Sequence, residues 1–131
     1  MAEYCVSSKL TDTPWQIENK AREYSFTCDD MTTAPNPVEY LTGAVNSCIV
    51  MSAGMVAKSH DLNVTDFKLD TEAETKNLGH GLSKVVAMTI KVSFQSDMDH
   101  DEQQKFLDHV LHVSTVYQTV KDAVPIEVTL K

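Results

Sequence analysis

The stretch that decides the fold is residues 36–48, which read NPVEYLTGAVNSC. Asn36 is a good N-cap, Pro37 suits a first helical turn, and Glu39 stands three residues after the cap, where a capping box needs it. Apolar and small residues then continue well past the end of this stretch, too far for a strand. The pattern predicts a helix over residues 37–59.

Cys48 lies near the middle of this predicted helix. A cysteine reacts as the thiolate and needs a positive neighbour to ionise at neutral pH. The helix dipole acts only in the end turns, so any activation must come from another element or another chain. The alternative is a buried cysteine that fills the core as a small hydrophobic residue. Met51 and Met55, four residues apart, are expected to fill the core or line a pocket.

The rest of the chain carries strand and helix patterns in turn. Asp99 begins a second helix with a capping box, and residues 115–121 continue or restart it. The predicted order β-β-β-α-β-β-α-β indicates an α+β fold, with helices on a mainly antiparallel sheet, in one domain over residues 1–131. The predicted strands cover residues 4–10, 15–18, 24–27, 64–74, 84–96 and 125–130, with turns at 11–14, 19–20 and 77–81.

Composition limits the classes of function. The 131 residues carry a net charge of −8, which argues against nucleic acid and anionic membranes, since both need a basic face. We recognise no signal peptide, and no apolar stretch reaches about 18 residues without polar interruption. The three cysteines match no zinc pattern and favour a reduced, cytoplasmic protein. No cofactor is predicted.

Several stretches resemble the OsmC/Ohr family, named for osmotically inducible and organic hydroperoxide resistance proteins. Residues 36–48 resemble the family's first-cysteine helix, and residues 85–94 with 101–107 resemble its late strand and second helix. Residues 113–120 resemble the family's Cys-Pro-Val motif, and the resemblance covers about residues 35–131. It implies an OsmC-like fold and an intertwined homodimer, whose central helices pack together and whose sites lie at the subunit interface.

The resemblance also implies a chemistry. Active members use one cysteine to attack the peroxide oxygen, and a second to close a disulfide that an external reductant opens. Cys48 falls on the first position and Ser114 on the second. A serine cannot form a disulfide, so the usual recycling cannot run on this pair. Cys28, in or beside the loop before the helix, either replaces the resolving thiol or is incidental.

Two charged residues are candidates for the same site. The organic-hydroperoxide branch of the family uses an early arginine and a glutamate ten residues before its cysteine. That glutamate position is Val38 here, with Glu39 one residue later as in more divergent branches, and Arg22 is the only arginine. Glu39 and Cys48 lie about 180° apart and about 13 Å along a regular helix. Glu39 therefore either closes the capping box or reaches a site formed by a partner subunit.

Two glycines bear on assembly. Gly43 and Gly54 each cost about 1 kcal/mol in a helix interior. They suggest close approach by another backbone or helix, either in a homodimer or within one chain.

Histidines offer a metal site as an alternative. His109 and His112 are three residues apart and share a helix face. Helix capping explains the acidic residues upstream, and no third ligand with convincing spacing is visible. The acidic residues are Asp97, Asp99 and Asp101, and His100 lies among them.

The sequence thus supports two functions. In the first, a homodimer reduces an organic or inorganic hydroperoxide at Cys48, with Cys28 or an external thiol resolving the sulfenate. This function requires Cys48 to face a cavity lined by two copies of the chain. In the second, the chemistry is lost with the second cysteine, and the interface binds a small apolar ligand. We favour the first.

Overall fold

The computed structural model describes residues 1–131. The chain divides into two compact units, residues 1–41 and residues 42–131. Helix α1 (Pro37–Ser59) runs without interruption across the boundary. The expectation of a single domain therefore stays a prediction.

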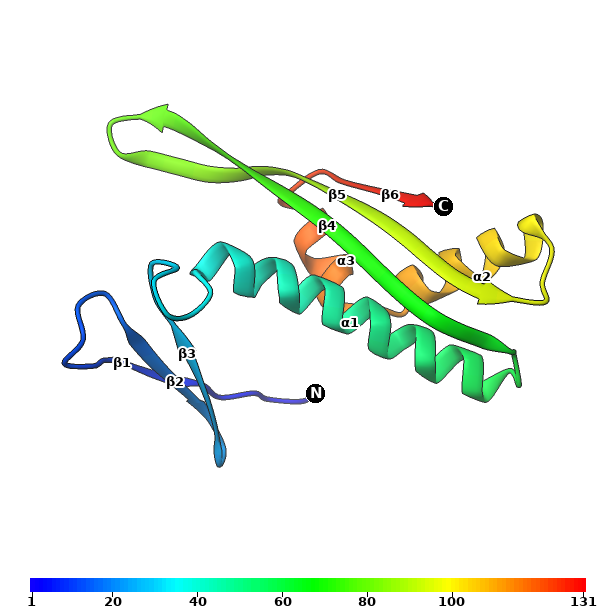
Figure 1. Cartoon of the computed structure of the whole chain (residues 1–131), viewed down its shortest axis with the longest axis horizontal. Coiled ribbons are helices and arrows are strands. Elements are labelled where there is room, and N and C mark those ends of the chain that lie inside the picture. The colour runs from blue at the N-terminus through cyan, green and yellow to red at the C-terminus, as the bar shows by residue number, and fades with distance from the viewer. The chain divides into compact units, whose positions relative to one another are not determined.

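The first unit contains a sheet of three antiparallel strands in the order β1-β2-β3, drawn in blue in Figure 1. The predicted turn at residues 19–20 is wrong, because both residues lie within β2 and the turn falls at Arg22 and Glu23. Asn19 instead accepts a hydrogen bond from the hydroxyl of Ser8 on the neighbouring strand (2.6 Å). The strands are β1 (Ser7–Leu10), β2 (Ile17–Ala21) and β3 (Tyr24–Cys28).

This first unit has almost no interior. Among residues 1–41 only Cys28 and Asp29 are buried, with 6% and 5% of their surface exposed. Large apolar side chains lie exposed on its strands and loops instead. They are Tyr4, Val6, Leu10, Trp15, Tyr24, Phe26 and Met31. A three-stranded sheet whose apolar side chains are exposed in this way is not expected to be stable alone.

The loop after β3 is built around Asp29. Its carboxylate accepts hydrogen bonds from the backbone N–H groups of Met31 (2.8 Å), Thr33 (2.9 Å) and Ala34 (3.2 Å), and from the Thr33 hydroxyl (2.7 Å). The hydrogen bond from the Thr33 side chain is the largest cause that lowers the pKa of Asp29 below its ordinary value of 3.8. The ionised carboxylate therefore holds the loop that leads into α1.

Helix α1 begins as the sequence predicts. The Asn36 side chain accepts from the Glu39 N–H (2.8 Å), and the Glu39 carboxylate accepts from the Asn36 N–H (2.9 Å), which completes the capping box. The buried residues of α1 are Val45, Ile49, Ser52, Ala53 and Val56. Met51 and Met55 do not fill the core, because each is 67% exposed on the opposite side of the helix.

By length and composition alone, α1 is apolar enough to cross a membrane. The expectation from the sequence concerned uninterrupted apolar stretches and is not contradicted, because Asn46, Ser47 and Ser52 interrupt this helix. About a third of the most apolar stretch is buried inside the fold, and the core helix of a non-membrane protein passes the same test.

The second unit has a mixed sheet in the order β4-β5-β6. Strands β4 (Val64–Gly79) and β5 (Leu82–Ser96) form a long antiparallel hairpin, and β6 (Ile126–Leu130) runs parallel to β5. The predicted loop at 77–81 shrinks to a tight turn at His80 and Gly81, both with positive φ. The antiparallel expectation thus holds for β4 and β5 but not for β6.

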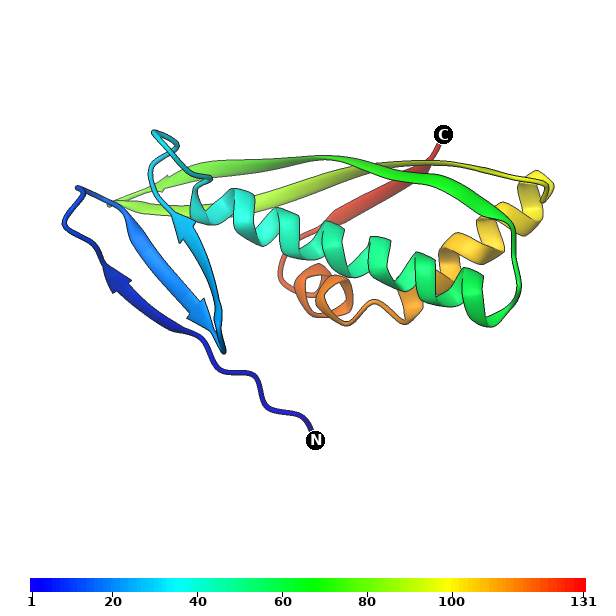
Figure 2. The same ribbon diagram turned by 60° about the horizontal axis from the view of Figure 1, so that its bottom comes forward.

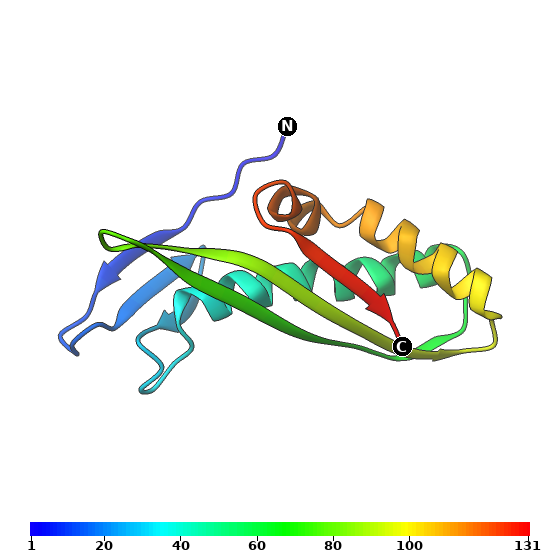
Figure 3. The same ribbon diagram turned by 90° about the horizontal axis from the view of Figure 1, so that it is seen from above.

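Two helices separate β5 from β6: α2 (His100–His112) and α3 (Thr115–Lys121). Residues 115–121 therefore restart a helix, and the order becomes β-β-β-α-β-β-α-α-β, with one helix more than predicted. Asp99 caps α2 with a full capping box, as predicted. Within the second unit the helices lie on one side of the sheet (Figure 2), and Figure 3 agrees. This is a mixed α+β fold.

The core of the second unit lies between that sheet and the three helices. Its centre contains side chains with 1% or less of their surface exposed, contributed by α1, β5 and α2. They are Val45, Ile49, Met88, Ile90, Val92, Leu107 and Val110. This packing fixes α1 against α2 and α3, and so places Cys48 beside the turn between the last two helices.

Candidate functional site

Cys48 lies on α1 and is partly buried, as a free thiol. The backbone N–H of Val116, in the first turn of α3, donates a hydrogen bond to the Cys48 Sγ at 3.4 Å. The donor belongs to a different helix, because in the middle of α1 the dipole of α1 itself does not act on the sulfur. No Lys, Arg or His side chain of the chain donates a hydrogen bond to this sulfur. Within one copy, the hydrogen bond to the sulfur therefore comes from a backbone donor.

Ser114 stands two residues before that donor and is fully buried. Its hydroxyl donates to the carbonyl oxygen of Val110 (2.7 Å) and its N–H to that of Leu111 (3.2 Å). Its own carbonyl accepts from the N–H of Gln118 (2.9 Å). Ser114 therefore joins the last turn of α2 to the first turn of α3. The structure brings the region of Ser114 next to Cys48. These are the two positions that the resemblance matches to the cysteines of the family.

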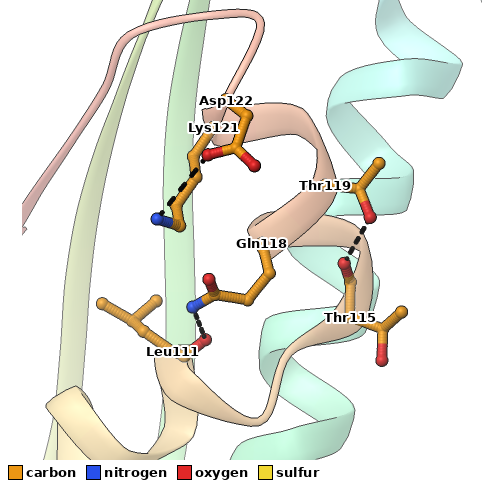
Figure 4. A network of polar contacts seen from close by, with 6 residues as sticks. All are labelled: Leu111, Thr115, Gln118, Thr119, Lys121 and Asp122. Atoms are coloured by element: carbon orange, nitrogen blue, oxygen red, sulfur yellow. Dashed lines mark hydrogen bonds and ion pairs between the residues drawn. The ribbon is translucent and has the colours of Figure 1, made fainter.

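Polar contacts on the outer side of α3 hold the same turn (Figure 4). The side-chain amide of Gln118 donates to the carbonyl of Leu111 (3.0 Å), and the Thr119 hydroxyl donates to the carbonyl of Thr115 (2.9 Å). On the inner side, burial raises the pKa of Tyr117, which packs against the core and stays a neutral phenol. The N–H that donates to Cys48 thus belongs to a turn that several hydrogen bonds hold in place.

The other candidate residues lie in the first unit. The Glu39 side chain forms a hydrogen bond in the capping box of α1. Arg22 is exposed, sits at a turn with φ 57°, and stacks its guanidinium over the ring of Tyr24 at 5.4 Å. Cys28 is the last residue of β3 and is buried. Their roles near Cys48 stay predictions, because no contact within one copy tests them.

The structure does not favour the metal alternative. His109 lines a groove beside the end of α1, where its ring contacts that of His60 edge to face at 5.7 Å. His112 lines a different groove, along the outer side of α3. No group of three or more His, Cys, Asp or Glu side chains in the chain is placed to hold a metal ion. Asp99 and Glu102 form the capping box of α2 instead.

Sequence reasoning missed the donor to Cys48. It is a backbone N–H, which any residue other than proline supplies, so no side-chain pattern marks it. The one available signal was the restart of a helix after Ser114, because the first N–H groups of a helix have no partner within it. A predicted helix start at residue 115 would have marked the N–H of Val116 as a donor without a partner within its helix.

Known proteins share this architecture. A family model described as OsmC-like protein matches residues 29–129. No curated protein matches the chain. The solved OsmC like protein from Mycoplasma pneumoniae is similar, with a TM-score of 0.88 and 14% identity over 99% of this chain and 96% of that one.

Other similar solved structures carry organic hydroperoxide resistance in their names. OhrB of Bacillus subtilis has a TM-score of 0.72 and 15% identity over 99% of this chain and 98% of that one. The Legionella pneumophila protein OsmC has a TM-score of 0.79 and 9% identity over 100% and 98%. At these identities the likeness shows the fold alone. The family model, in contrast, spans most of the sequence, and the chain therefore belongs to the family of OsmC-like proteins.

Proposed function

We propose that this protein is a thiol-dependent peroxidase of the stress response that reduces organic hydroperoxides at Cys48. The observation that supports this most is the hydrogen bond from the Val116 N–H to the Cys48 Sγ (3.4 Å). An N–H aimed at a partly buried sulfur is an arrangement that suits an anionic sulfur. Similar proteins from Legionella and Bacillus are named for organic hydroperoxide resistance.

The proposed step is a two-electron transfer. The Cys48 sulfur attacks the outer oxygen of the hydroperoxide, and the S–O bond forms as the O–O bond breaks. The inner oxygen leaves with the electron pair and takes a proton, which gives the alcohol. The peroxide is reduced and Cys48 becomes a sulfenic acid, with all atoms accounted for.

Recovery of the thiol must bypass Ser114, which has no sulfur and whose hydroxyl is bonded to Val110. An external thiol attacks the sulfenic acid, releases water and leaves a mixed disulfide on Cys48. A second external thiol then displaces Cys48 and leaves as an external disulfide. Cys28 is the alternative first partner, provided that Cys28 of the same copy or of another one reaches the sulfur.

The proposal includes a homodimer in the cytoplasm, with the two chains intertwined. Two surfaces support an assembly: the first unit, which buries only two of its residues, and the outer side of α1, where Val50, Met51 and Met55 are exposed. Apolar surface of this extent commonly marks an interface between proteins. In such a dimer the partner supplies a cation to Cys48, with Arg22 as the candidate and Glu39 beside it.

A second function follows from the missing second cysteine. If Cys48 does not reduce hydroperoxides catalytically, the same fold binds a small apolar molecule at the dimer interface. The buried, fully bonded Ser114 hydroxyl favours this alternative, because it occupies the position of a resolving thiol without its chemistry. A Cys48→Ala variant that binds its ligand unchanged would support it.

The test is mass spectrometry after one equivalent of cumene hydroperoxide, with a sulfenic acid trap. We expect one added oxygen, trapped at Cys48 and absent from Cys48→Ser. Cys28→Ser is the matched control, and it separates resolution by Cys28 from resolution by an external thiol. In Ser114→Cys we expect a disulfide between positions 48 and 114. An intact fold in which Cys48 stays a free thiol would contradict the proposal.

A further inference from the structure

A groove that the proposed chemistry does not use opens in the second unit, with a volume of about 320 Å³. It is lined by residues from the last turns of α1 and from the first half of α2, which come close to each other in Figure 2. Its apolar lining consists of Val56, Leu62, Met98 and Phe106. Val56 lies eight residues after Cys48, about 12 Å along the helix, so the groove is distinct from the thiol site.

The apolar lining is part of the core and not a loose surface. Val56 and Phe106 are 7% and 5% exposed, and Leu62 and Met98 pack against the same cluster. The ring of Phe106 is held edge to face by Phe67 at 6.4 Å and by Phe94 at 5.5 Å. A thioether beside a fixed aromatic ring suits an alkyl chain or a second ring. The groove is thus preformed for an apolar group.

The rim of the groove carries a cation without a partner. Lys105 lines it and takes part in no ion pair, whereas the three ion pairs of the chain involve other lysines. The acidic residue of the rim, Glu102, is already committed, because its carboxylate accepts the N–H of Asp99 in the capping box of α2 (3.2 Å). The imidazoles of His60 and His109 form the rest of the rim.

We propose that this groove binds a small monocarboxylate with an apolar tail, such as a medium-chain fatty acid. The tail lies on Met98 and Phe106, and the carboxylate meets the ammonium of Lys105. The volume lies near the lower end of the range of about 300–1,000 Å³ for small-molecule sites, which suits a short chain. A single free lysine fits one carboxylate. A nucleotide or an anionic lipid surface would need a cluster of cations.

The test measures binding of octanoate by ligand-observed NMR and by calorimetry, below the concentration at which it forms micelles. We expect saturable binding with a Kd of about 0.1–1 mM, the weak range for one ion pair and a short apolar tail. Shifts in the protein spectrum should centre on Met98, Phe106 and His109. 1-Octanol, with the same tail and no charge, should bind the same residues more weakly.

Two lysine variants separate the groove from the overall charge. Lys105→Glu should weaken octanoate about tenfold and leave 1-octanol unchanged, because it replaces attraction by repulsion at the rim only. Lys84→Glu makes the same change of net charge on β5, away from the groove, and should alter octanoate binding less than about twofold. Met98→Gln should weaken both ligands.

Three results would overturn the proposal. They are the absence of saturation by about 5 mM octanoate, equal binding to the Lys105→Glu and Lys84→Glu variants, and binding that falls as the protein concentration rises, which would mean that another copy covers the groove. The outcome is independent of the peroxidase proposal, because Cys48→Ser should bind octanoate as the natural chain does.

Discussion

The two units of this chain bury their residues very differently. The first, residues 1–41, forms a regular antiparallel sheet with only Cys28 and Asp29 buried. The second packs three helices on a mixed sheet around a continuous apolar core. Strand pairing and turn chemistry alone thus produce a sheet, but burial decides which part is stable by itself. The candidate thiol lies in the unit with the core, next to the packed residues of α1 and α3.

The largest effect is expected from the core of the second unit. Leu107→Ala removes a side chain that is 1% exposed and should lower the free energy of unfolding by about 2–5 kcal/mol at any protein concentration. Leu10→Ala is the matched change in the first unit, at a side chain that is 72% exposed. Its effect should depend on protein concentration if the proposed dimer covers that position. Urea unfolding at two concentrations measures both. Equal, concentration-independent losses would mean that the first unit has a core of its own.

The outer side of α1 is expected to give the next largest effect. Met51 is 67% exposed in one copy and belongs to the proposed interface. Met51→Glu places a charge there and should weaken dimer formation about tenfold or more, because burying an unpaired carboxylate is costly. Analytical ultracentrifugation follows the dimer and the monomer. Lys58→Glu, near the end of the same helix, is the control. A natural chain that is monomeric at high concentration would remove the proposed dimer.

The two capping boxes allow a direct comparison of the units. Asn36 caps α1 from the first unit, and Asp99 caps α2 in the second. Replacing either by alanine should cost about 0.5–2 kcal/mol, because the backbone N–H of Glu39 or of Glu102 loses its side-chain acceptor. Urea unfolding gives both values. We expect a clear loss at Asp99, whose helix packs on the core, and a loss at Asn36 that is no larger. The reverse order would contradict the contrast between the units.

The smallest effect is expected at the loop before α1. Hydrogen bonds, chiefly from the Thr33 side chain, lower the pKa of Asp29 below 3.8. Its folded pKa is below the unfolded value, so the ionised form stabilises the loop above about pH 4, and this contribution is lost as the pH falls further. The difference in urea midpoint between the natural chain and Asp29→Asn should therefore shrink from pH 6 to pH 3. Asp30→Asn is the exposed control. A constant difference would contradict this role of the carboxylate.

Local signals in the sequence predicted the parts of the fold that local chemistry determines. The capping boxes at Asn36 and Asp99 gave the starts of two helices, and alternation gave the long hairpin. The predicted position of the turn after β2 was wrong because Arg22 adopts a positive φ, which is uncommon for arginine and cannot be read from the residue type. The parallel pairing of β6 depends on contacts far apart in the sequence and has no local signal.

The candidate site was predictable only in part. Resemblance to a family supplied Cys48 and Ser114, and the structure places them in one region. The N–H of Val116 could not be predicted, because a backbone donor leaves no mark in the residue type. The outer side of α1 was also missed, since its apolar residues are spread almost evenly around the helix and do not distinguish the buried from the exposed side.

A competition between two thiols tests the central claim most directly. Cys5, in the first unit, is exposed, and Cys48, in the second, is partly buried. We would follow the oxidation of both by limiting cumene hydroperoxide at neutral pH, using peptide mass spectrometry over time. If the surroundings of Cys48 activate its sulfur, Cys48 reacts first although it is less accessible. Oxidation of Cys5 before Cys48, or of neither, would contradict the account.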